Sequence, residues 1–262
     1  MSKFPHARCR GFTLVELLIV VAIIGILAAL VVTSAMYAIY HARNAAVLAE
    51  ARNIEAALLQ LKQQHPGLQS FPPDGTAGAA SIEAFVNKMF DRRVASDAPA
   101  LGIDINTGNR IAADLVDIGP TESLHFWLSG FGQDPQRPLS DPNRATAGFN
   151  FDPLRLTDED GDGWLEYAPK YCGGTPYVYF AAATYDSASY THHNAGVAAP
   201  YKSDLPLTQF AAAGQFQIIA AGQDGNFGNG AGGSFPSGVG YSEGDRDNIT
   251  SFSEGTLESQ LP

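Results

Sequence analysis

The longest uninterrupted hydrophobic segment of the chain lies near its N-terminus. Leu17–Tyr40 is 24 residues long and contains no formal charge. As an α-helix it would be about 36 Å long, which is enough to cross a hydrocarbon core of roughly 30 Å. Its apolar side chains would cover every face, whereas a helix on the surface of a soluble protein is apolar on one side only. The pattern therefore predicts a transmembrane helix.

The charges before this segment predict its orientation. Lys3, Arg8 and Arg10 precede it, and the first acidic residue is Glu16. Positively charged flanks stay in the cytoplasm, so we expect the rest of the chain to be exported. A secretory signal peptide is the alternative, but its apolar region is usually about 7–15 residues long, and no clear small-x-small cleavage site follows here. An ionised Glu16 at the edge of an apolar segment needs a partner, which makes it a functional candidate.

A second, amphipathic pattern follows the apolar segment directly. Charged residues alternate with apolar ones at helical spacing, the latter being Ala45, Leu48, Ile54, Leu58 and Leu61. His65-Pro66-Gly67 ends the pattern, because proline and glycine both break helices. The sequence thus predicts one helix over residues 12–65. We expect its half at 12–40 to lie in a membrane or a filament core, and its half at 41–65 to pack on a globular head.

The remaining residues, 66–262, combine helix and strand signals and predict an α+β head. Residues 176–181 and 216–221 are rich in β-branched and aromatic side chains, and we expect them to pair as antiparallel strands. Helices are expected at Ser81–Phe90 and from Thr121 to Leu128, with Ser81 and Thr121 as caps. The fold prediction is a long N-terminal helix packed on a small antiparallel sheet with long loops.

Charge distribution separates the two parts of the chain. The net charge is −11, yet residues 1–65 hold six basic and only three acidic side chains. The rest is strongly acidic and would repel a phosphate backbone, so we expect the head not to bind nucleic acid. Two cysteines, Cys9 and Cys172, cannot form a disulfide framework. We expect Cys172 to be a buried thiol without a reactive role.

One acidic loop has the spacing of a calcium ligand set. Asp158, Asp160, Asp162 and Glu166 occupy positions one, three, five and nine of an EF-hand-type loop. Pro169 stands where the bidentate acid at position twelve would be, and no helix pattern flanks the loop, so a solvated acidic turn is the alternative. For His192-His193 no acid or cysteine stands at ligand spacing, and a loop position is favoured over a metal site.

The segment Arg10-Gly11-Phe12-Thr13-Leu14-Val15-Glu16 resembles the processing signal of type IV prepilins and type II secretion pseudopilins. In that family a short basic leader ends in glycine, followed by Phe-Thr-Leu-x-Glu and about twenty apolar residues. The resemblance implies that residues 1–11 are a leader, cut after Gly11 by a membrane prepilin peptidase, and that the new terminus at Phe12 is N-methylated. Thr33 stands where the family often has a proline, so the kink associated with that proline is in doubt.

The resemblance also implies roles and partners. Glu16 would neutralise the terminal amine of a neighbouring subunit during filament assembly. The partners would be copies of the chain, related pilin-like subunits, the peptidase and an assembly platform in the inner membrane. The fold would be pilin-like, and because the family's head is usually shorter, residues 75–150 and 183–212 would be insertions.

A second acidic, glycine-rich region lies at 221–230 and 243–251, and it resembles the C-terminal calcium loop of major pseudopilins. Carried over by position, Asp224 and Asp247 would be the side-chain ligands, with Asp245 and Ser251 as further candidates. The gap between the two segments is longer than in that family, and an acidic tail without metal is the alternative. A bound Ca²⁺ would be structural, since it cancels repulsion among carboxylates.

These features together predict a structural subunit of a pilus-like filament with a single inner-membrane span and an exported head. The tail loop favours a type II secretion pseudopilin. The large insertions favour a minor pilin or a type IV pilin for adhesion, motility or DNA uptake. A membrane-anchored enzyme is the least favoured class, because no local nucleophile motif such as Gly-x-Ser-x-Gly occurs.

Overall fold

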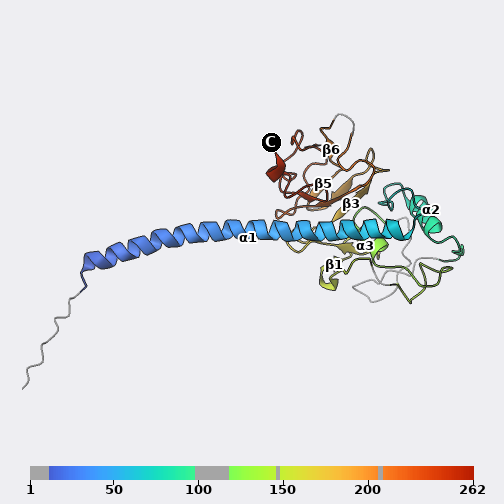
Figure 1. Ribbon diagram of the computed structural model, residues 1–262, viewed down its shortest axis with the longest axis horizontal. Coiled ribbons are helices and arrows are strands. Elements are labelled where there is room, and N and C mark those ends of the chain that lie inside the picture. Colours follow the sequence, from blue (N-terminus) through green and yellow to red (C-terminus); the bar gives the residue numbers. More distant parts are fainter. Residues whose placement is uncertain (1–11, 98–117, 146–147, 206–208) are drawn as a thin grey trace, which may run out of the picture. The chain divides into compact units, whose positions relative to one another are not determined.

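The computed structural model describes residues 12–97, 118–145, 148–205 and 209–262 (Figure 1). The chain divides into two compact units, Met1–Arg43 and Asn44–Pro262. The elements within these ranges are those of an α+β protein, with one long N-terminal helix followed by two shorter helices and several small sheets. The predicted fold class is therefore confirmed.

Helix α1 runs from Leu14 to Gln64, within one residue of the predicted end and two of the predicted start. The Thr33 hydroxyl donates hydrogen bonds to the carbonyl oxygens of Ala29 and Leu30, and the helix continues through this position. In the first unit, every described residue from 12 to 43 is exposed. α1 is the one helix in the described part of the chain that is long and apolar enough to cross a membrane.

A three-stranded antiparallel sheet forms the centre of the second unit. Strand β7 (Phe216–Ala220) lies between β3 (Val178–Ala181) and β9 (Ile249–Thr250), with Val178 opposite Ile219. The predicted pairing of the segments at 176–181 and 216–221 is confirmed. Both strands are buried along their whole length, which explains why they read as continuous apolar runs rather than alternating ones.

Successive side chains of these strands enter two different cores, as the period-two geometry of a strand requires. On one face, Tyr179 and Ile218 pack with the buried stripe of α1, which consists of Val47, Ala51, Ile54, Ala57 and Leu58. On the other face, Phe180 and Ile219 pack with residues of the region 185–227 and with Leu257. The expected contact between the outer half of the long helix and the sheet is therefore present.

The other strands in the described part of the chain are short and form three two-stranded sheets. β1 (Leu156–Thr157) pairs with β2 (Glu166–Tyr167), and β4 (Tyr190–His192) pairs with β5 (Gly196–Ala198), both antiparallel. β6 (Lys202–Ser203) pairs in parallel with β8 (Ser234–Phe235). Single 3₁₀ turns occupy Pro153–Arg155 (η2) and Glu258–Gln260 (η3).

Two short helices build a separate aromatic core. α2 (Ala79–Met89) contributes Ile82, Phe85, Val86 and Met89 to it, and α3 (Ser123–Leu128) contributes Phe126 and Trp127. Leu124 and Leu128 of α3 pack instead in the core shared by α1 and the central sheet. Phe85 and Trp127 meet edge to face with ring centroids 5.1 Å apart. Both helices were predicted.

The predicted caps of these two helices are wrong. Ser81 lies inside α2, where its hydroxyl donates a 2.7 Å hydrogen bond to the Gly78 carbonyl, and Gly78 itself is the N-cap with a φ of 79°. At α3 the N-cap is Glu122, and the Thr121 hydroxyl donates to the Glu122 carboxylate (2.5 Å) instead of accepting from the helix. Neither hydroxyl accepts a capping hydrogen bond from the helical amide groups.

Candidate functional site

The start of α1 is capped by the side chains of Thr13 and Glu16, which belong to the predicted processing motif. The Glu16 carboxylate accepts hydrogen bonds from the Thr13 amide and hydroxyl (both 2.8 Å), and the Thr13 hydroxyl accepts from the Glu16 amide (3.2 Å). This is a reciprocal capping box, which satisfies amide groups that the first turn of a helix leaves unpaired. Thr-x-x-Glu before an apolar segment is the sequence signature of that cap, so Glu16 stabilises the start of α1.

The predicted cleavage site lies between Gly11 and Phe12. Gly11 lies outside the described residues, and Phe12 is the first described residue, with 70% of its surface exposed. The predicted processing site and the cap are thus consecutive in the sequence, with Phe12 directly before Thr13.

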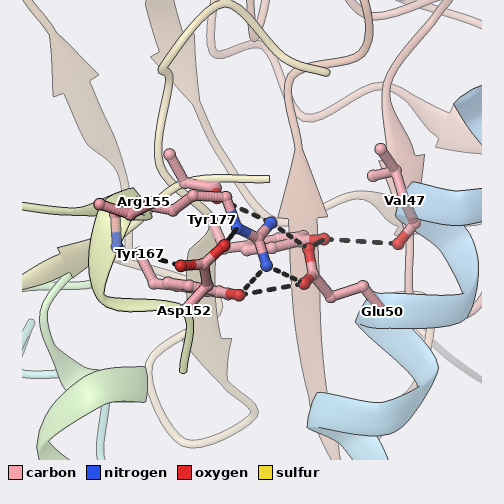
Figure 2. Close-up of polar contacts among 8 residues, drawn as sticks. Val47, Glu50, Asp152, Arg155, Tyr167 and Tyr177 are labelled. Atoms are coloured by element: carbon pink, nitrogen blue, oxygen red, sulfur yellow. Dashed lines mark hydrogen bonds and ion pairs between the residues drawn. The ribbon is translucent and has the colours of Figure 1, made fainter. Parts of the chain in front are cut away.

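In the second unit, Glu50 of α1 is the centre of a polar cluster that Figure 2 shows. Its carboxylate forms a two-pronged ion pair with the Arg155 guanidinium, whose Nη1 lies 2.9 Å from Oε2. The Tyr167 and Tyr177 hydroxyls donate to the same carboxylate over 3.1 and 3.0 Å. Arg155 also lies over the Tyr167 ring, 4.5 Å from its centroid.

This cluster fastens the helix to the head. Arg155 is the last residue of η2, Tyr167 lies on β2, and Tyr177 directly precedes β3. Side chains from three segments of the head therefore contact one side chain of α1. Burial, followed by the negative charge of Glu50, raises the pKa of Tyr177 well above its ordinary value, which keeps the hydroxyl a donor. With both carboxylate oxygens engaged, the cluster is suited to positioning rather than to catalysis.

The predicted calcium loop is the connection of the β1–β2 hairpin. The structure brings Asp158, Asp160 and Asp162 together, with one carboxylate oxygen from each within 4.8 Å of the others. In each residue one oxygen accepts a backbone amide of the loop, from Gly161, Asp162 and Trp164 respectively.

Glu166 is placed differently from the three aspartates. It lies on β2, is only 2% exposed, and its Oε2 has no hydrogen-bond partner among the described residues. Burial, and then the neighbouring Glu122 carboxylate, raise the pKa of Glu166 to about 8. Burial also raises the pKa of Asp162 to about 7, with added repulsion from Asp160, Glu122 and Asp158.

Glu122 was not among the expected site residues, although it is 3% exposed and acts on both Asp162 and Glu166. It precedes α3, far from the loop in sequence, and no spacing rule connects the two. Its carboxylate accepts hydrogen bonds from the Gly119 amide (2.7 Å) and the Thr121 hydroxyl.

The histidine pair does have an acidic neighbour. The Nε2 of His192, on β4, lies 2.9 Å from the Glu159 carboxylate, and Nδ1 of His193 lies 3.6 Å from it. The Asn194 amide donates to Nδ1 of His192, so the ring proton sits on Nε2 and is donated to Glu159. A metal on that Nε2 would displace the proton and break the Asn194 bond, so the arrangement favours a neutral hydrogen-bonded histidine.

The tail loop brings two of its four expected ligands together. Asp247 Oδ2 accepts the amides of Gln223 (2.8 Å) and Asp224 (3.1 Å), while its Oδ1 is buried without a partner among the described residues. Burial, with the charge of Asp224 adding to it, raises the pKa of Asp247 to about 6. Gly222 approaches so closely that a Cβ there would lie 2.3 Å from the Asp247 carboxyl carbon. An orphaned, partly buried carboxylate oxygen beside a second carboxylate fits a cation ligand pair.

The other two expected ligands are engaged elsewhere. Asp245 is 4% exposed, and its carboxylate accepts from the Tyr201 hydroxyl (2.8 Å) and from the amide and hydroxyl of Ser242. The Ser251 hydroxyl accepts the amide of Ile218 on the central strand β7 (3.2 Å). Cys172 is fully buried as expected, and burial raises the pKa of its thiol to about 12.

Comparison with known proteins gives one match. Residues 6–32 match the family model of the prokaryotic N-terminal methylation motif. No curated protein and no solved structure gives a significant match to the chain. A methylation motif that runs directly into a long apolar helix, followed by an α+β head, fits a type IV prepilin-like protein.

Proposed function

We propose that the chain is a structural subunit of a pilus-like filament that assembles from the inner membrane. The observation that carries this proposal is the continuity of the matched motif with α1, whose residues from Leu14 to Arg43 are all exposed. A helix of this kind is stable in lipid or among similar helices, and not alone in water. Membrane anchoring and association with related subunits follow from the same property.

In this proposal the leader, residues 1–11, stays in the cytoplasm until the prepilin peptidase cuts after Gly11. The freed and methylated amine of Phe12 then pairs with Glu16 of a neighbouring copy, because opposite charges neutralise one another where the dielectric is low. The hydrogen bonds to Thr13 occupy Oε2 of Glu16. Oε1 therefore remains for the amine, and the cap need not open during assembly.

Within this class we favour a type II secretion pseudopilin that drives protein export. The orphaned oxygen of Asp247 beside Asp224 supports this choice, since a C-terminal calcium loop is the feature that the resemblance to major pseudopilins implies. The long segment between β3 and β7, which contains β4–β6, favours the alternative of a minor or specialised type IV pilin. Neighbouring genes test the choice: a secretin with an assembly ATPase supports secretion, and a retraction ATPase supports a motility pilus.

Processing is tested with Gly11→Ala. We expect the variant to accumulate at precursor size and to lack the methyl group on Phe12, as measured by immunoblot and by mass spectrometry of the N-terminus. Gly25→Ala is the matched control, because a Cβ at Gly25 meets no atom within 4 Å. A mature-sized band from Gly11→Ala, with Gly25→Ala processed normally, would exclude this cleavage site.

Assembly is tested with Glu16→Gln, which keeps the shape of the side chain and removes its charge. We expect processed subunit in the membrane but loss of filaments, measured by shearing and electron microscopy in the native host. Glu55→Gln, at a partly exposed residue in the outer half of the same helix, is the control and should assemble. Filaments formed equally well by both variants would contradict the proposed role of Glu16.

We also propose that the tail loop binds a structural Ca²⁺ through Asp224 and Asp247. Asp247→Ala should then lower the melting temperature of the detergent-solubilised chain in calcium and leave it little changed in chelator. The same shift in both solutions would show that Asp247 acts only through its hydrogen bonds to the loop amides.

A further inference from the structure

The aromatic residues of the long helix α1 occur at one place only. Tyr37 and Tyr40 are the only phenylalanine, tyrosine or tryptophan residues between positions 13 and 70. At a rise of about 1.5 Å per residue they lie about 32 and 36 Å along α1 from Glu16, and a hydrocarbon core is about 30 Å thick. The two tyrosines therefore fall where a helix that enters a membrane at Glu16 would leave it.

The two tyrosines form a ring cluster with His41. The ring centroids of Tyr37 and His41 are 4.1 Å apart and those of Tyr40 and His41 are 5.5 Å apart, both in edge-to-face geometry. Tyr37 is 68% exposed and Tyr40 37%, so the cluster lies on the surface of α1. Rings with an apolar body and a polar tip concentrate at the headgroup level of a bilayer, where hydrocarbon meets water.

The charge pattern indicates the same boundary. Arg43 is exposed, and it is the only formally charged residue between Glu16 and Glu50. Basic residues usually gather on the cytoplasmic side of a span, so an arginine directly after the predicted exported end runs against the general rule. At that level a guanidinium can bind lipid phosphate through two hydrogen bonds while its methylene stem stays at apolar depth.

We propose that Tyr37, Tyr40, His41 and Arg43 form an interfacial belt that binds the phosphate headgroups of anionic lipid in the leaflet facing the exported head. The proposal rests on the membrane anchoring of α1 that the proposed function includes, but it requires no filament. The belt sets the depth of α1, because a shift inward would draw the tyrosine hydroxyls into hydrocarbon, and a shift outward would expose apolar side chains such as Met36 to water.

The chemistry of the belt favours lipid over a second copy of the chain. Helix contacts inside a bilayer are enriched in small residues, because these let the two backbones approach closely. The belt instead consists of bulky rings and a cation. Two copies joined side by side at this level would bring two Arg43 guanidinium groups together, whereas lipid phosphate has the complementary charge.

The depth of α1 is measured on the full chain in nanodiscs of an even mixture of phosphatidylcholine and phosphatidylglycerol. A spin label is attached at Gly25→Cys or at Ala42→Cys in a Cys9→Ser background, and its depth follows from relaxation by oxygen and by a water-soluble nickel complex. A Cβ at Gly25 meets no atom within 4 Å, and Ala42 is exposed. Cys172 remains, because it is fully buried.

We expect the Gly25 label in hydrocarbon and the Ala42 label at the headgroups. Replacing both tyrosines, as Tyr37→Ala with Tyr40→Ala, should move the Ala42 label by about 5 Å, one helical turn. Leu27→Ala with Leu30→Ala is the matched control, because these residues have the same spacing and are also exposed. The control should leave the depth unchanged. All these positions precede Asn44, the first buried residue of α1, so the cores of the head stay intact.

Lipid selectivity tests Arg43. When the discs are dissolved in mild detergent, phosphatidylglycerol should be enriched over phosphatidylcholine about fivefold among the lipids that stay bound, the factor expected for one basic residue at an anionic surface. Native mass spectrometry counts these lipids. Arg43→Gln should abolish the enrichment, and Lys88→Gln, at an exposed lysine of α2, should keep it.

Three outcomes would overturn the belt while leaving membrane anchoring in place. The first is equal depth of the Ala42 label in the tyrosine and leucine variants, with the Gly25 label in hydrocarbon. The second is unchanged lipid enrichment in Arg43→Gln. The third is weaker cross-linking between copies of the tyrosine variant at unchanged depth, which would assign the cluster to a contact between chains. A Gly25 label in water would refute the anchoring of α1, and the belt with it.

Discussion

At the scale of single residues, His125 links the stability of the head to pH. Burial, with repulsion from Arg144 added to it, lowers the pKa of His125 to about 4. The unfolded chain takes up this proton near pH 6.5, so between pH 6.5 and 4 the unfolded state binds more protons than the folded one. The free energy of unfolding should therefore fall as the pH falls through this range, and His125 should have no effect above it.

We expect His125→Gln to reduce this acid sensitivity by roughly 2–3 kcal/mol between pH 7 and pH 4, relative to the unmodified chain. Urea unfolding at several pH values, in a constant detergent, measures the difference. His193→Gln is the control, because the side chain of His193 is 64% exposed. If the His125 variant loses as much stability on acidification as the unmodified chain, the histidine is protonated in the folded state.

The sequence predicted site residues correctly where they lie close together along one segment of the chain. The three aspartates of the 158–162 loop alternate in one turn, and the structure brings their oxygens together. Glu122 could not be predicted, because the chain fold alone brings it beside Glu166. For the same reason Asp245 and Ser251, which were selected by position in the sequence, turn to partners in other segments.

At the scale of elements, the attachment of α1 to the head depends on Glu50. Its ion pair with Arg155 is four-fifths buried on both sides. Removing one partner of such a pair leaves an uncompensated charge, and we expect Glu50→Gln to cost about 2–3 kcal/mol of unfolding free energy. Chemical denaturation of the full chain in detergent gives this number. Tyr167 and Tyr177 would lose a charged acceptor at the same time.

Glu55→Gln is the matched control, since it is the same substitution on the same helix. Glu55 pairs with Arg52 over 3.4 Å, and because 46% of the Arg52 side chain is exposed, this pair should contribute only about 0–1 kcal/mol. A double-mutant cycle of Glu50→Gln with Arg155→Met should give a coupling energy of about 1–3 kcal/mol. Equal effects of the two glutamate variants, or additive effects in the cycle, would show that the helix is held by its apolar stripe alone.

Elements were predictable in proportion to their length and periodicity. α1 and the β3–β7 pair followed from long regular patterns, and they occur where expected. The two-residue strands β1, β2, β6 and β8 carry no periodic signal, because two residues cannot show a period. The predictions of the helix caps were wrong because Gly78 is the N-cap of α2, and because the Thr121 hydroxyl donates to the Glu122 carboxylate.

At the scale of the whole molecule, apolar exposure divides the chain at the boundary between its two units. Most exposed large hydrophobic side chains of the described residues lie within 12–40. In the second unit only Leu59, Leu154, Leu205 and Val239 are in that class among the described residues, and they are scattered along the sequence. Isolated exposed apolar residues are ordinary for a soluble domain. All three hydrophobic cores lie within residues 47–257.

We therefore expect the fragment 44–262 to fold as a soluble monomer without detergent, whereas the full chain requires detergent or lipid. Light scattering after size-exclusion chromatography and thermal melting by circular dichroism measure this. The fragment 66–262 is the control and should not fold cooperatively, because it lacks Val47, Ile54 and Leu58 from the core. Each such loss costs about 2–5 kcal/mol, against a usual total stability of about 5–15 kcal/mol. Aggregation of the longer fragment, or a cooperative transition in the shorter one, would mean that the head does not depend on the outer half of α1.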